Sequence, residues 1–139
     1  MLRVTADSNI YISAMNFGGA PDKLLDMARN GDIVLAISDP IVEEVTHVLC
    51  DKFGWSDEAI KLAQARIADF TEKVQPRRAI DVVKEDPSDN RILECAEAGG
   101  SEFIVTEDAH LLKLGQFAGM KILKPAEFLG LQSSPGRGR

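Results

Sequence analysis

Apolar residues along the chain follow two spacings, one typical of buried strands and one typical of helices. Short apolar or alternating runs predict strands at residues 2–6, 33–37, 103–106 and 120–123. Apolar residues at every third or fourth position predict helices over residues 8–14, 20–30, 38–49, 56–74 and 87–98, with a short one at 111–112. Residues 80–83 fit either a short strand or an extended connection, and residues 125–129 fit a final turn. The alternation of strands and helices predicts an α/β fold with a mainly parallel central sheet.

The composition is that of one folded domain. The chain has 139 residues, of which 45% are hydrophobic and 27% charged. We assign residues 1–130 to the domain and expect a flexible polar tail at 131–139. The longest aliphatic run spans residues 33–37, whereas a membrane-spanning helix needs about 20 apolar residues, so we expect no membrane association. Cys50 and Cys95 are far apart in the sequence, which predicts two buried free thiols in a protein of the reducing cytoplasm.

Charge is distributed unevenly along the chain. The net charge is −6, and 21 of the 22 acidic residues precede residue 113. An acidic body argues against binding nucleic acid through bulk charge. It is compatible with acids that are gathered to hold cations.

Four carboxylates fall where a parallel sheet places its functional sites, at the carboxyl ends of the strands. Asp7 ends the first predicted strand, Asp108 follows the strand at 103–106, and Asp89 lies in the first turn of a helix. Glu44 lies beside the apolar stripe of its helix, whereas Glu43 points about 100° away toward solvent. We expect these four acids to reach one crevice.

Four carboxylates in one crevice repel each other unless cations balance them. Carboxylate oxygens are the ligands that Mg²⁺ and Mn²⁺ prefer, and such ions activate water for phosphodiester cleavage. Each residue also has a structural interpretation: the aspartates fit helix caps or turns, and Glu44 fits a solvated helix flank. The pattern formed by all four acids together favours the metal site.

Four segments resemble the PIN domain (PilT N-terminus) nucleases, and most closely the toxin components related to VapC. They are Val4-Thr5-Ala6-Asp7-Ser8-Asn9-Ile10, Ser38-Asp39-Pro40-Ile41-Val42-Glu43-Glu44-Val45, Asp86-Pro87-Ser88-Asp89-Asn90-Arg91-Ile92-Leu93-Glu94-Cys95-Ala96 and Phe103-Ile104-Val105-Thr106-Glu107-Asp108. Each segment alone is weakly specific, but their order and spacing together cover residues 1–130. The resemblance implies a three-layer α/β/α fold and an endoribonuclease in which a metal-activated water cleaves RNA and leaves a 3′-hydroxyl and a 5′-phosphate. It also implies a homodimer and a cognate antitoxin protein.

The resemblance also assigns roles within the site. Asp7, Glu44, Asp89 and Asp108 become the metal-binding catalytic acids, with Mg²⁺ or Mn²⁺ as cofactor. Asn9 and Thr106 become polar supports that orient these acids. Asp86 matches the family pattern either as part of the site or as a turn residue. His110 stands where relatives often have a second aspartate, so a second ion would be held weakly.

An acidic nuclease must hold its substrate by local positive charge. The candidates are Lys52, Arg77, Arg78, Arg91, Arg137 and Arg139. Each also fits a solvated surface charge.

Three alternatives remain from the sequence. The first is a PIN-fold module that binds RNA or protein with weak or no catalysis, which His110 favours. The second is a di-iron site, because Glu44 and His47 form one Glu-x-x-His half-site, although such sites need two copies. The third is a phosphohydrolase of the haloacid dehalogenase type, in which Asn9 stands where an aspartate is required.

Overall fold

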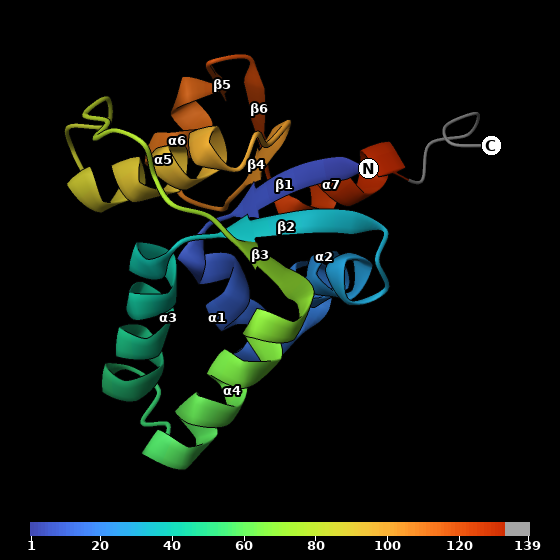
Figure 1. Ribbon diagram of the computed structural model, residues 1–139, viewed down its shortest axis with the longest axis vertical. Helices are drawn as coiled ribbons and strands as arrows, with labels where there is room; N and C mark the ends of the chain where they lie inside the picture. Colours follow the sequence, from blue (N-terminus) through green and yellow to red (C-terminus); the bar gives the residue numbers. More distant parts are fainter. Residues whose placement is uncertain (133–139) are drawn as a thin grey trace.

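Six strands form one sheet in the order β3-β2-β1-β4-β6-β5, and the computed structural model describes residues 1–132 (Figure 1). The strands are β1 Leu2–Ala6, β2 Ile33–Ile37, β3 Thr71–Lys73, β4 Phe103–Val105, β5 Gln116–Phe117 and β6 Met120–Leu123. The helices are α1 Ser8–Phe17, α2 Gly19–Arg29, α3 Asp39–Asp51, α4 Asp57–Phe70, the 3₁₀ turn η1 Pro87–Asp89, α5 Asn90–Ala98, α6 Ala109–Leu114 and α7 Pro125–Gln132. From residue 133 onward, the expected tail lies outside the described residues.

The sheet is parallel except at one edge. β1 pairs with β2 and β4, β2 pairs with β3, and β4 pairs with β6, all in parallel, whereas β5 runs antiparallel to β6. β2 is apolar throughout, as expected for a strand covered on both faces. The predicted α/β fold with a mainly parallel sheet is therefore confirmed.

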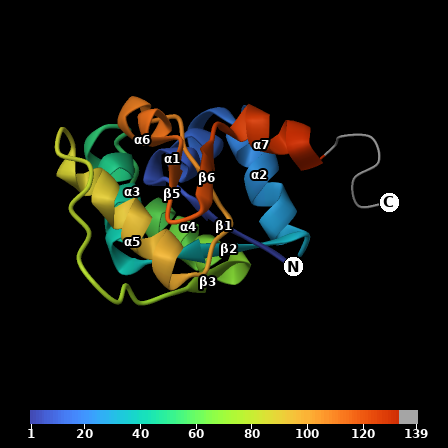
Figure 2. The same cartoon turned by 90° about the horizontal axis from the view of Figure 1, so that it is seen from above.

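Helices cover both faces of this sheet. Seen from above, α5 lies on one side of β1 and β2, and α2 and α7 lie on the other (Figure 2). The core between these layers includes Leu24, Leu35, Leu93, Ile104 and Phe128, each fully buried. This three-layer arrangement leaves the carboxyl ends of β1, β2 and β4 side by side, where α1, α3 and α6 begin.

Three local features differ from the sequence predictions. The helix predicted over 56–74 ends at Phe70, because residues 71–73 pair with β2 as an edge strand. Residues 125–129 begin the helix α7 rather than a turn, whereas residues 80–83 form the extended connection, one of the two structures expected there. β5 was not predicted, since it is a two-residue strand.

Cys95 is buried as predicted, but the expectation for Cys50 was wrong. Cys50 follows Leu49, which faces the core, and the next residue of a helix points about 100° away. Its thiol is therefore exposed. Across residues 1–132, no helix has both the length and the apolar character needed to cross a membrane.

Candidate metal centre

Four side chains that could bind a metal ion converge beyond the carboxyl end of β4. They are Asp86, Asp89, Asp108 and His110, and one ligand atom from each lies within 4.8 Å of the others. We call these four residues the acidic cluster. Asp86 is the N-cap of η1 and Asp89 is its last residue, and the other two lie at the start of α6.

Asp89 is the buried member of the acidic cluster. Its residue is only 5% exposed, and its Oδ2 atom is buried without a hydrogen-bond partner among the described residues. Burial is the main cause that raises the pKa of Asp89 to about 8. The Asp108 side chain raises it further, through a shared hydrogen bond and its charge, as do the charges of Asp86 and Asp7. Without a cation, Asp89 therefore keeps its proton at neutral pH.

Asp108 and Asp86 have a structural role as well as a place in the acidic cluster. Asp108 is the N-cap of α6, and its Oδ1 accepts hydrogen bonds from the backbone N–H groups of His110 (2.8 Å) and Leu111 (3.1 Å). Asp86 caps η1 by accepting from the backbone and hydroxyl of Ser88. The interpretation of these two residues as caps is therefore correct. The capping hydrogen bonds use only Oδ1 of each carboxylate, so other lone pairs can still bind a cation.

Asp7 lies next to the acidic cluster but is held by hydrogen bonds. The Thr106 hydroxyl donates to Asp7 Oδ2 at 2.7 Å, and the same oxygen of Thr106 accepts from the backbone N–H of Asp108 at 2.9 Å. The backbone N–H of Asn9 donates to Asp7 Oδ1 at 3.3 Å, so Asn9 supports Asp7 through its backbone while its side chain is exposed. Burial raises the pKa of Asp7 and the charge of Glu44 adds to this, whereas these hydrogen bonds and one from Ser8 lower it.

Glu44 reaches Asp7 through a serine. Ser8 Oγ lies 2.7 Å from Glu44 Oε2 and 3.2 Å from Asp7 Oδ1, so its hydroxyl hydrogen is shared between two carboxylates. Glu43 is exposed, as the helical spacing indicated. We call Asp7 and Glu44 the bonded pair. Hydrogen bonds through Ser8 and Thr106 thus link Asp7, Glu44 and Asp108, and Asp89 lies next to Asp108 in the acidic cluster.

A divalent cation fits the acidic cluster on this geometry. The cluster offers carboxylate oxygen atoms, which are ordinary ligands of Mg²⁺ and Mn²⁺, and one imidazole nitrogen, which first-row transition ions accept. The buried Asp89 Oδ2 lacks a donor, and a cation would satisfy it. A cation would also offset the mutual repulsion that raises the pKa of Asp89.

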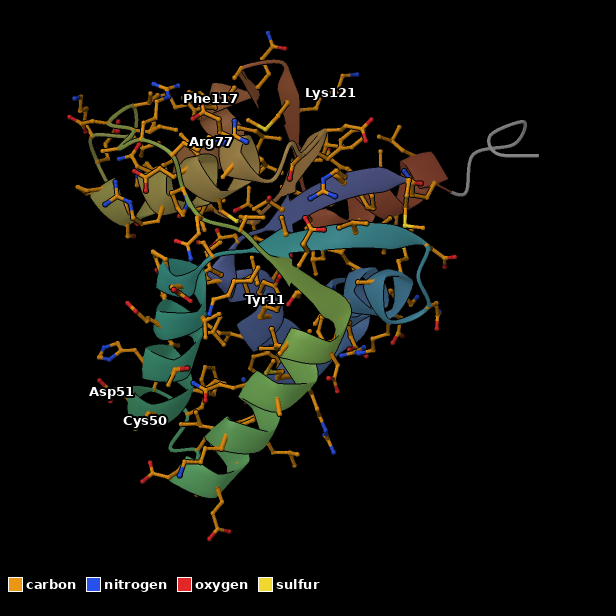
Figure 3. All side chains as sticks on the ribbon, in the orientation of Figure 1. Tyr11, Cys50, Asp51, Arg77, Phe117 and Lys121 are labelled. Atoms are coloured by element: carbon orange, nitrogen blue, oxygen red, sulfur yellow. The ribbon has the colours of Figure 1, made fainter. Side chains whose placement is uncertain are left out.

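Two of the predicted basic residues are engaged with acids. Arg78 binds both carboxylate oxygens of Glu97, and Arg91 pairs with Glu94. Arg77 is exposed on the connection that follows β3 (Figure 3). Lys52 is exposed at the end of α3, whereas Arg137 and Arg139 lie outside the described residues.

A hollow beside the acidic cluster was missed by sequence reasoning. It has a volume of about 410 Å³ and shares His110 with the cluster. Its lining is Val82, Val83, Lys84, Glu85, His110, Lys113 and Leu114. The sequence did hold a signal in the positions of two lysines: Lys84 lies two residues before Asp86, and Lys113 is one helical turn beyond His110.

The structure gives no support to a di-iron site at Glu44 and His47. His47 lies on the exposed face of α3, where its Nε2 atom is 3.1 Å from Asp51 Oδ2. Figure 3 places Asp51 at the far end of α3 from the sheet. Glu44 points instead to Ser8.

The chain is similar to a known family in sequence and to a solved structure in fold. The sequence model of the PIN domain matches residues 3–110. The crystal structure of VapBC2 from Rickettsia felis bound to a DNA fragment from their promoter is similar, with a TM-score of 0.60 and 16% sequence identity over 87% of this chain and 97% of that chain. At this identity the likeness concerns the fold. No curated protein sequence matches this chain.

Proposed function

The chain belongs to the PIN domain family, and we propose that it is a divalent-metal-dependent endoribonuclease of the cytoplasm. The observation that carries this proposal is the acidic cluster, in which the buried Asp89 Oδ2 lacks a hydrogen-bond donor beside Asp108 and His110. Such an arrangement is costly unless something positive occupies it. Mg²⁺ or Mn²⁺ is the cofactor that these ligand atoms suit.

Each side chain has a separable task in this proposal. A bound divalent cation supplies positive charge at the scissile phosphate and acidifies a water. Asp89 and Asp108 hold the ion, and Asp89 must give up its proton to do so. Thr106 fixes Asp7 relative to Asp108, and Ser8 fixes Glu44 relative to Asp7. The bonded pair thus keeps its carboxylates oriented toward the edge of the acidic cluster before any substrate arrives.

RNA is the substrate we propose, and the hollow beside His110 is a route by which it can reach the acidic cluster. Lys84 and Lys113 supply positive charge on its wall, and Val82 and Leu114 supply apolar surface for a base. Arg77 is exposed and available for a phosphate, whereas Arg78 and Arg91 would first have to leave their glutamates. Recognition by a few local cations suits a chain whose net charge is −6.

The test compares Asp89→Asn with the control Glu107→Gln. Both changes remove one carboxylate charge, but Glu107 is exposed while Asp89 is buried. We expect Asp89→Asn to lower RNA cleavage in Mg²⁺ or Mn²⁺ by at least about 100-fold, typical for a group that acts directly on the reaction. The control should stay within about twofold of wild type, and circular dichroism checks that both fold. Equal cleavage by Asp89→Asn and wild type would refute the assignment.

We further propose that the chain is the toxin of a toxin–antitoxin pair and forms a homodimer. The family resemblance supports this, and the similar R. felis structure is a VapBC2 complex. Induced expression of the wild-type chain should arrest growth, and expression of Asp89→Asn should not. Light scattering during gel filtration should give twice the 15.2 kDa chain mass.

A binding module with weak or no catalysis is the second candidate, and His110 is the observation that favours it. Relatives often have an aspartate at this position, and a histidine offers no negative charge to a second ion. RNA that binds tightly but stays intact in both Mg²⁺ and Mn²⁺ would establish this candidate over the first.

A further inference from the structure

His110 places a nitrogen atom among the carboxylates. Its Nδ1 atom lies 4.0 Å from Asp89 Oδ2 and 3.9 Å from Asp108 Oδ1. Two ligands of one ion lie no farther apart than twice the bond length, roughly 4.2 Å for bonds of about 2.1 Å. Both pairs of atoms therefore lie within the reach of a single cation.

Two further observations indicate that the imidazole is placed for ligation. Asp89 Oδ2, which lies 4.0 Å from the ring nitrogen, is the buried atom that has no donor. The backbone N–H of His110 is tied to Asp108 Oδ1 at 2.8 Å, so the first turn of α6 fixes the histidine against the acid. The His110 side chain is 44% exposed, which leaves the ring accessible to an incoming ion.

An imidazole ligand changes which ion the site prefers. Mg²⁺ is hard and takes oxygen ligands, whereas first-row transition ions accept nitrogen and oxygen together. We propose that His110 Nδ1 is a metal ligand, and that the mixed nitrogen and oxygen ligand set makes this site select Mn²⁺ over Mg²⁺. This inference rests on the proposed metal centre and specifies its ligand and its ion.

Direct binding to the metal-free protein tests the selectivity. Calorimetric titration with Mn²⁺ and with Mg²⁺ is compared for wild type, His110→Ala and His110→Asp. The matched control is His47→Ala, which removes the exposed histidine paired with Asp51. We expect wild type to bind Mn²⁺ at least about tenfold more tightly than Mg²⁺, and His110→Ala to lose about tenfold in Mn²⁺ affinity with little change for Mg²⁺. His110→Asp should bind Mg²⁺ more tightly than wild type does, because it restores an all-oxygen site.

Pulsed electron paramagnetic resonance of bound Mn²⁺ tests the ligand itself. The spectrum of wild type and of His47→Ala should show nitrogen modulation from a directly bound imidazole, and that of His110→Ala should not. Bound Mn²⁺ without nitrogen modulation in wild type overturns the inference, as does equal affinity for the two ions. Nitrogen coupling in a protein that leaves RNA intact supports the ligand and refutes the nuclease. Failure of wild type to bind either ion overturns both.

Discussion

The bonded pair and the acidic cluster are neighbouring groups of acids that meet opposite requirements. Asp7 and Glu44 receive hydrogen bonds from Ser8, Thr106 and the backbone of Asn9. Asp89 is as deeply buried as Asp7, yet its Oδ2 has no donor. The protein itself satisfies the first group, whereas in the second it leaves the buried Asp89 Oδ2 without a donor.

This difference suits the two groups to different roles: the bonded pair is held in a fixed orientation, and the acidic cluster is suited to bind an ion. Hydrogen bonds to a charged carboxylate favour its charged form, and unpaired burial favours the neutral form. The pKa of Asp7 is accordingly pulled down by three donors against its burial, whereas every cause acting on Asp89 raises its pKa. The bonded pair therefore forms without a cation, whereas we expect Asp89 in the acidic cluster to lose its proton when a cation binds.

The largest expected effect comes from breaking the acidic cluster at Asp108. Asn is as good an N-cap as Asp, so Asp108→Asn keeps the start of α6 while removing an anionic ligand. We expect RNA cleavage to fall by at least about 100-fold, as for removal of one group that stabilises the transition state. We also expect most of the rise in melting temperature that Mn²⁺ gives wild type to be lost. A variant that retains both properties would mean that Asp108 is a cap and nothing more.

A smaller effect is expected where Thr106 joins the two groups. Thr106→Val keeps the shape but leaves Asp7 Oδ2 without its donor and the backbone N–H of Asp108 without its acceptor. Leaving such buried groups unpaired costs about 1–3 kcal/mol, which urea unfolding would measure. Cleavage should fall by about tenfold, since Asp7 loses its fixed position. Thr106→Ser keeps the hydroxyl, so similar losses in the Val and Ser variants would contradict this role.

The sequence predicts the layers of this fold better than its edges. Long apolar periodicities identify β1, β2 and the main helices because burial on a fixed face imposes the spacing. At Phe70 the helical spacing continues to Val74, but Thr71 takes an extended conformation and residues 71–73 pair with Leu35–Ile37. The helix ends there because the edge of β2 is available for pairing with residues 71–73, and the local sequence pattern does not show this.

For the site, the sequence predicts where the acids lie in the fold, but not which side chains bind to one another. Parallel topology requires Asp7 and Asp108 to end neighbouring strands, and the helical period separates Glu44 from Glu43. Which acids share a cation depends on hydrogen bonds across 36 to 99 residues of sequence, such as Ser8 to Glu44 and Thr106 to Asp7. Asp86 and His110 were predicted as supports, yet the structure places them in the acidic cluster itself. Their roles as ligands stay a prediction.

The stability of the metal-free protein should depend on pH, because ionisation of Asp89 in the acidic cluster is unfavourable. Folding raises the pKa of Asp89 from 3.8 to about 8, so the folded state binds more protons than the unfolded state between these values. Stability is therefore fully present below about pH 4 and falls as the pH rises through about 8. Asp89→Asn removes this fall. In a chelator, the melting temperature of wild type should drop by about 3–6 °C more between pH 7 and pH 8 than that of the variant, because about 1 kcal/mol is lost over this interval.

The control for this pH profile is Glu107→Gln, which removes an exposed acid from the connection between β4 and α6. It should follow the wild-type curve. Parallel curves for wild type and Asp89→Asn would show that Asp89 is already ionised in the metal-free protein, and the contrast with the bonded pair would be lost.

The smallest expected effect comes from the bonded pair, and it measures how far the protein stabilises these acids by itself. Ser8→Ala removes the hydroxyl shared by Glu44 and Asp7, and urea unfolding should show a loss of about 0.5–1.5 kcal/mol. Ser13→Ala on the same helix is the matched control, because alanine improves helix propensity at both positions and the difference isolates the bridge. Mn²⁺ should restore little of this loss, since the ion binds the acidic cluster and not the serine. Full restoration by Mn²⁺ would instead place Asp7 and Glu44 among the ion's ligands, and the two groups would then act as one site.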